Sequence, residues 1–155
     1  MTQPPMDTAQ AFEVERYKYI LQQLHTVNEN VYRFVAIYQT IATVLVGAAL
    51  TLFVRYEDWH IRPEVARIGI VAILLLLTVV AGFTVLLIVV GILNWLDYRR
   101  EECELTEVAV RPGFRHPPRT SNFWRWYETW MVGFIVVSLA FLWLGTIAVV
   151  LPAIA

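Results

Sequence analysis

Three long stretches of the chain contain no Asp, Glu, Lys or Arg, namely residues 34–54, 68–96 and 129–155. Uncharged apolar stretches that exceed about 18 residues are typical of transmembrane helices. The composition agrees, because 58% of the 155 residues are hydrophobic and 16% are charged, whereas a soluble domain is charged at about a quarter of its residues. These features exclude an ordinary soluble enzyme, a disordered chain and a secreted disulfide scaffold.

The pattern predicts an all-α integral membrane protein with three spans at about 34–54, 68–96 and 130–151, and a polar loop at 97–128. The first span has 21 residues, which at about 1.5 Å per residue matches a hydrocarbon core of about 30 Å. Residues 9–33 contain no Pro or Gly and carry apolar residues at helical spacing. We therefore expect residues 1–33 to form an amphipathic helix continuous with the first span, and residues 34–155 to form the transmembrane domain.

The basic residues are divided unequally between the two sides of such a membrane protein. Residues 1–33 and 97–128 contain nine Lys and Arg residues, whereas residues 55–67 contain three. This bias places the N-terminus in the cytoplasm and the C-terminus on the opposite side of the cell (plasma or inner) membrane. No signal peptide is visible in the first 33 residues, so we expect the first span to direct insertion.

A heptad pattern runs from the polar N-terminal segment into the first span and continues to Leu45. Its first seven positions are Tyr17, Leu21, Leu24, Asn28, Val31, Val35 and Tyr38. The pattern predicts a coiled-coil seam in a homo-oligomer, in which the buried amide of Asn28 would fix the number of subunits. The alternative is that this helix packs on residues 97–128 of its own chain, with Asn28 in contact with solvent.

Gln39, Thr43 and Gly47 are four residues apart and form one stripe on the first predicted span. One interpretation is a packing face, because small residues let two helix backbones approach closely. The other is a polar lining that faces the axis of a ring of subunits. A pore of this kind would need no charged side chain.

Two further clusters lie just before the third predicted span or at its start. Arg111, Arg115, Arg119 and Arg125 are expected to contact an anionic lipid or ligand, or to pair with the acidic residues at 101–107. Trp124, Trp126 and Trp130 are expected to anchor the chain at the membrane interface, because indole rings favour the headgroup region. Nucleic-acid binding is not indicated, since the net charge is −1 and the interface accounts for the aromatic residues.

The sequence predicts no catalytic chemistry, no metal site and no cofactor. His25, His60 and His116 lie in three different segments, and neither an HExxH nor a CxxC motif is present. Cys103, the only cysteine, lies between Glu102 and Glu104, whose negative charges oppose formation of a thiolate. We therefore expect a protein that is not an enzyme.

The layout of the first third of the chain resembles the small helical membrane effectors of bacterial defence loci, the SLATT type among them. The residues that carry this resemblance are 15–24, which run into the apolar segment 34–54. The third span departs from that plan, which usually has two. The resemblance implies a homo-oligomeric pore-forming or membrane-perturbing effector in antiviral defence. The alternative is a membrane anchor that recruits a cytoplasmic protein through residues 9–33 and 111–125.

Overall fold

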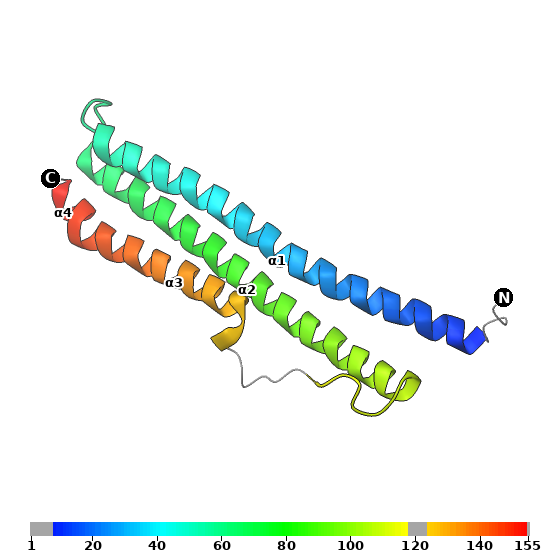
Figure 1. The fold of residues 1–155 in the computed structure, drawn as a ribbon. Coiled ribbons are helices and arrows are strands. Elements are labelled where there is room, and N and C mark those ends of the chain that lie inside the picture. Colours follow the sequence, from blue (N-terminus) through cyan, green and yellow to red (C-terminus); the bar gives the residue numbers. More distant parts are fainter. Residues whose placement is uncertain (1–7, 118–123, 155) are drawn as a thin grey trace.

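The computed structural model describes residues 8–117 and 124–154, which form a bundle in which each long helix runs antiparallel to the next one along the chain (Figure 1). Helix α1 spans Thr8–Arg55, and α2 spans Pro63–Ala109. The third helical stretch consists of α3 (Tyr127–Gly145), a π-helical segment η2 (Thr146–Val150) and α4 (Leu151–Ala153). Each of the three stretches is long and apolar enough to cross a membrane.

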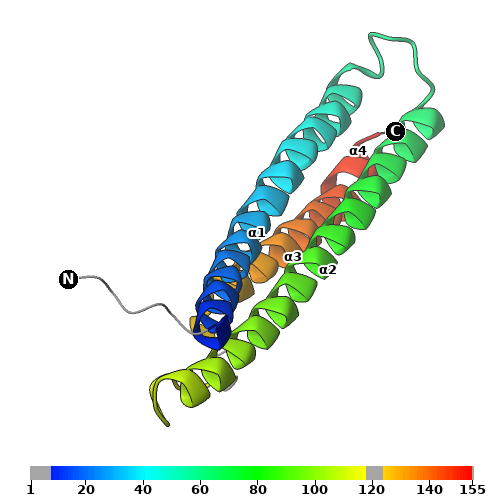
Figure 2. The same ribbon diagram turned by 90° about the vertical axis from the view of Figure 1, so that its right-hand side faces the viewer.

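The continuous first helix is confirmed, because α1 runs without a break from the polar segment through the apolar one. The turn at 56–62 then leads into α2, which starts with Pro63 in its first turn, where the missing amide hydrogen costs nothing. The N-terminal part of α1 and the C-terminal part of α2 extend well past the N-terminal end of α3 (Figures 1 and 2). The result is a long helical hairpin with a shorter third helix packed along the half that contains the turn.

The polar loop predicted at 97–128 is wrong in its first part, because α2 continues to Ala109. No Pro or Gly occurs between residues 97 and 111, so nothing in the backbone stops the helix before Pro112 and Gly113. The last helical stretch also continues to Ala153, two residues beyond the predicted end of the third span at 151. The π-helical turn that precedes Pro152 supplies the local backbone adjustment.

The core lies where all three helices meet, with α2 in the centre. Its buried residues come from α1, α2 and α3 and are Val31, Tyr38, Leu74, Leu77, Ala81, Ile88 and Ile135. Trp143 of α3 donates a hydrogen bond of 3.1 Å from Nε1 to Oγ1 of Thr78 on α2. Near the turn, Arg67 donates to the carbonyl of Ile154, which ties the C-terminal end of the third stretch to the start of α2.

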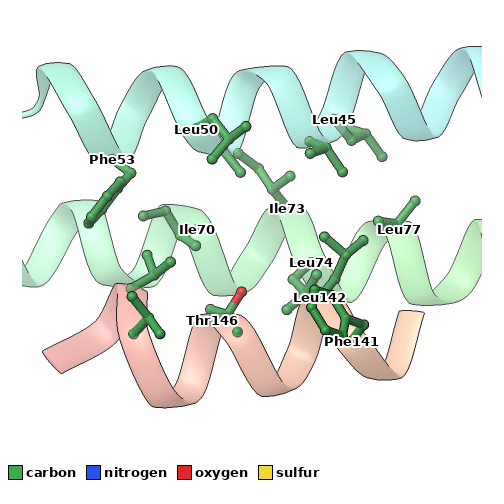
Figure 3. A pocket seen from close by; sticks show the side chains of 15 residues that line it. Leu45, Leu50, Phe53, Ile70, Ile73, Leu74, Leu77, Phe141, Leu142 and Thr146 are labelled. Atoms are coloured by element: carbon green, nitrogen blue, oxygen red, sulfur yellow. The ribbon is translucent and has the colours of Figure 1, made fainter. Parts of the chain in front are cut away.

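A cleft of about 290 Å³ lies between the three helices on the side of the turn (Figure 3). Leu45, Leu50 and Phe53 of α1 line it together with residues of α2 and of the third stretch. Among the described residues of this lining, Thr146 has the one polar side chain. The cleft is therefore an apolar space suited to hydrocarbon.

The hairpin depends on close approach of α1 and α2, which Gly91 permits. A Cβ atom at Gly91 would lie 3.3 Å from Cγ2 of Val31, a β-branched side chain with little rotamer freedom. We expect Gly91→Leu to lower the free energy of unfolding by about 1–3 kcal/mol through overpacking. Thermal unfolding of the protein in detergent, followed by tryptophan fluorescence, measures this loss.

Gly82→Leu is the matched control, because a Cβ atom at this position of the same helix would meet nothing within 4 Å. Both variants replace a glycine in α2 by leucine, which favours the helix by the same amount. The difference in stability between the two variants therefore reports packing alone. Equal unfolding temperatures for the two variants would show that α1 does not contact α2 at Gly91.

Candidate functional site

The projecting end of the hairpin, which we call the hairpin tip (residues 8–20 and 99–117), is held together by ion pairs. Arg16 of α1 pairs with Glu101 of α2. Arg99 pairs with Glu102 one helical turn further along α2. The Arg16–Glu101 pair fastens α1 to α2 outside the apolar segments, whereas the Arg99–Glu102 pair lies within α2.

Glu102 is the centre of this arrangement, because its side chain is fully buried. Arg115 lies after the end of α2, and its Nε is 3.3 Å from Oε1 of Glu102. This contact is an ion pair without hydrogen-bond geometry, and Oε1 has no hydrogen-bond partner among the described residues. A buried carboxylate is stable only when it is paired, so Arg99 and Arg115 together keep Glu102 in place.

The segment after α2 folds back onto the hairpin through these contacts. Gly113 has a φ of 73°, a left-handed conformation that glycine adopts without strain, and it turns the chain toward Glu102. Interaction with the side chain of Tyr17 on α1, together with the charge of Glu102, raises the pKa of Arg115. Arg115 therefore connects α1, α2 and the following segment.

A cleft of about 610 Å³ opens at the hairpin tip between α1, α2 and the segment that Arg115 holds. Three of its apolar side chains, Val14, Val110 and Phe114, are exposed. The remaining lining residues are Gln10, Glu13, Tyr17, Lys18, Leu105, Thr106 and Ala109. Exposed apolar surface in a concave site is typical of a surface that binds another molecule.

The predicted seam packs within one chain. Leu24, Val31 and Tyr38 are buried, and the seam from Val31 onward belongs to the core that α1 forms with α2 and α3. Leu21 is exposed. An antiparallel partner in the same chain therefore covers most of the line that we expected to join separate copies.

Asn28 is neither a buried coiled-coil amide nor fully solvated. Its side chain is half-buried, and its Oδ1 lies 3.5 Å from the hydroxyl of Tyr127 at the start of α3. The ring of Tyr127 stacks on Tyr32 of α1 with a centroid distance of 5.4 Å. Asn28 therefore belongs to the contact between α1 and α3.

The polar stripe of the first span faces away from the bundle. Gln39, Thr43 and Gly47 are all exposed, although Gln39 also lines a small cleft against α3. Thr43 donates a hydrogen bond of 2.8 Å to the carbonyl of Gln39. The hydroxyl is thus satisfied within its own helix, and all three residues of the stripe are left exposed by the described part of the chain.

Of the predicted arginines that the structure describes, Arg115 is the one with an ion pair. Arg115 pairs with Glu102, whereas Arg111 is exposed and has no ion pair within residues 8–117 and 124–154. Arg125 lies near the start of α3, and Arg119 lies outside the described residues. The expected pairing with the acidic residues at 101–107 is therefore present for Arg115.

The three predicted anchor tryptophans lie together at the start of α3. Trp124 and Trp130 pack edge to face, and Trp130 donates from Nε1 to the carbonyl of Trp124 at 3.1 Å. Trp126 packs edge to face on Trp95 of α2 at a centroid distance of 6.1 Å. The aromatic cluster joins α3 to α2 at the end of the apolar segments.

Sequence reasoning missed the buried role of Glu102 and the part that Phe114 takes in the cleft. The available signal was the run of residues 97–111 without Pro or Gly, which extends α2 past Glu102 to Ala109. Within the part of the chain that the structure describes, no three His, Cys, Asp or Glu side chains form a group that could hold a metal ion. Comparison with protein-family models, curated proteins and solved structures finds no match for this chain.

Proposed function

We propose that this chain is a non-catalytic membrane anchor that presents the hairpin tip in the cytoplasm, where the cleft binds an apolar segment of a partner protein. The three long apolar helices support insertion into a bilayer. The excess of Lys and Arg in residues 1–33 and 97–128 supports a cytoplasmic position for the tip.

The observation that carries the proposal is an apolar cleft far from the apolar segments. Val14, in the cleft, precedes Phe34, the first residue of the charge-free run, by 20 residues. This separation corresponds to about 30 Å along a helix, whereas the headgroup layer on one side of a bilayer is about 5–8 Å thick. The exposed side chains of the cleft therefore face water beyond the lipid, and a protein partner accounts for them better than the bilayer does.

The proposal is tested by introducing a photo-crosslinking amino acid at Phe114 in the full chain, in cells that express it. We expect a protein crosslink from this position and none from Trp59 at the opposite end of the hairpin. Val14→Asp should lower the crosslinked yield by about tenfold or more, because an unpaired carboxylate in a desolvated contact costs several kcal/mol.

Val108→Asp is the matched control, because Val108 is 85% exposed on the same end of α2 and does not line the cleft. A crosslinked yield that falls equally in both variants would show a general effect of charge. A yield that Val14→Asp leaves unchanged would overturn the assignment of the cleft.

A second candidate function is a homo-oligomeric, pore-forming effector of the kind that the resemblance implies. It is favoured by the exposed position of Gln39, Thr43 and Gly47 on the outer face of α1, where a second copy could reach them. The mass of the protein in nanodiscs and dye leakage from liposomes test it. Particles of four or more subunits, and leakage that the double variant Gln39→Leu/Thr43→Val abolishes, are expected; a monomer, or unchanged leakage, contradicts it.

A further inference from the structure

A small cavity of about 200 Å³ lies where the start of α3 meets α1 and α2. Asn28 of α1 and Trp95 of α2 form two of its walls, and Trp126 packs on Trp95. The remaining lining residues are Ile92, Arg125, Tyr127 and Glu128. The cavity is distinct from the cleft at the hairpin tip, with which it shares no residue.

The cavity holds one positive and one negative side chain that do not pair with each other. Arg125 is exposed and makes no ion pair with any residue in 8–117 or 124–154. Glu128 is half-buried and makes no ion pair with any residue in 8–117 or 124–154. A ligand that complements this lining carries a negative group for Arg125 and a positive group for Glu128.

The start of α3 adds to the attraction for a negative group. The helix dipole favours an anion at this end of α3, where no side chain of the described residues caps the first turn. Arginine is the side chain best suited to phosphate, which it binds through two parallel N–H donors. A phosphate is therefore the anion that fits the Arg125 side of the cavity.

The position of the cavity relative to the apolar segments indicates which kind of molecule supplies the phosphate. Asn28 precedes the charge-free run that begins at Phe34, Trp95 lies at the end of the second run, and Arg125 precedes the third. All three positions mark the border between apolar and polar segments, where lipid headgroups lie and indole rings concentrate. A phospholipid is thus the source of phosphate at this depth.

We propose that this cavity binds the headgroup of a phospholipid that carries both a phosphate and a primary ammonium, as in phosphatidylethanolamine. The phosphate lies at Arg125 and the first turn of α3, and the ammonium donates to Glu128 and faces the rings of Trp95 and Trp126. The inference rests on the insertion into a bilayer proposed above. An anionic headgroup without an amine leaves Glu128 unpaired and is repelled by it.

Native mass spectrometry of the purified full chain in detergent, titrated with phosphatidylethanolamine or phosphatidylglycerol of the same acyl chains, tests this proposal. We expect tighter binding of phosphatidylethanolamine. Arg125→Gln should weaken the binding of both lipids by about tenfold, which corresponds to one lost charge-assisted phosphate contact. Glu128→Gln should weaken the binding of phosphatidylethanolamine alone.

Arg111→Gln is the matched control, because this exposed arginine does not line the cavity, and we expect it to bind both lipids as the wild type does. Equal losses in Arg111→Gln and Arg125→Gln would overturn the site, and a preference for phosphatidylglycerol that Glu128→Gln leaves unchanged would overturn the ammonium contact. Failure of insertion is distinguishable, because the chain would then be recovered from the soluble fraction of cells.

Discussion

Leu77→Arg should greatly reduce the amount of this chain in the membrane fraction. Leu77 is 1% exposed and lies in the core that α2 forms with α1 and α3. Arginine at the centre of a transmembrane helix costs about 2.5–3.5 kcal/mol on insertion scales, and overpacking of the core adds about 1–3 kcal/mol. Carbonate extraction of membranes, followed by immunoblotting of the pellet, measures the inserted fraction.

Two other arginine substitutions separate the cost of insertion from the cost of overpacking. Leu75 is 53% exposed on the outer surface of the same segment, so Leu75→Arg should carry the insertion cost without the overpacking cost. Val108, beyond the apolar part of α2, is 85% exposed, and Val108→Arg should leave the inserted fraction unchanged. If all three variants fractionate alike, the apolar part of α2 does not lie in a bilayer.

Glu102→Gln should loosen the hairpin tip while leaving the core between the three apolar helical stretches intact. The substitution keeps the shape of the side chain and removes the charge that Arg99 and Arg115 share. Breaking a fully buried pair costs about 3–5 kcal/mol. Because side chains of both arginines are partly exposed, at 24% and 40%, we expect about 1–2 kcal/mol after allowance for solvent screening.

Hydrogen exchange followed by mass spectrometry measures the loosening. A loss of about 1.4 kcal/mol corresponds to tenfold faster exchange, which we expect in residues 8–20 and 105–117 and not in residues 70–90. Glu104→Gln is the control, because Glu104 is exposed on the same helix and has no ion pair among the described residues. Unchanged exchange in Glu102→Gln would show that the ion pairs do not hold the tip together.

The helices themselves could be predicted from the sequence because their determinants are local. The charge-free runs set the three apolar segments, and the absence of Pro and Gly from residues 9–33 makes α1 continuous with the first of them. The start of α2 at Pro63 follows from the tolerance of a first helical turn for proline. Each of these inferences depends on neighbouring residues alone.

The helix that packs on each apolar helix face could not be predicted in the same way. The spacing from Tyr17 to Tyr38 defines an apolar line on α1 and is equally compatible with a second copy and with an antiparallel helix of the same chain. Leu24 and Val31 lie buried inside the chain, and the close approach at Gly91 helps to decide between these partners. The pairing of Arg115 with Glu102 likewise depends on where two distant segments meet.

The measurement that tests the central proposal most directly is the topology of the hairpin in the membrane. Cys103 is the only cysteine, so Cys103→Ser provides a background in which Asp58→Cys and Val108→Cys are introduced separately; both positions are exposed. In intact cells, a membrane-impermeant maleimide should label Asp58→Cys, and should label Val108→Cys only after the membrane is made permeable. Labelling of both positions from the same side, or of Val108→Cys alone in intact cells, would contradict an anchor that presents its tip to the cytoplasm.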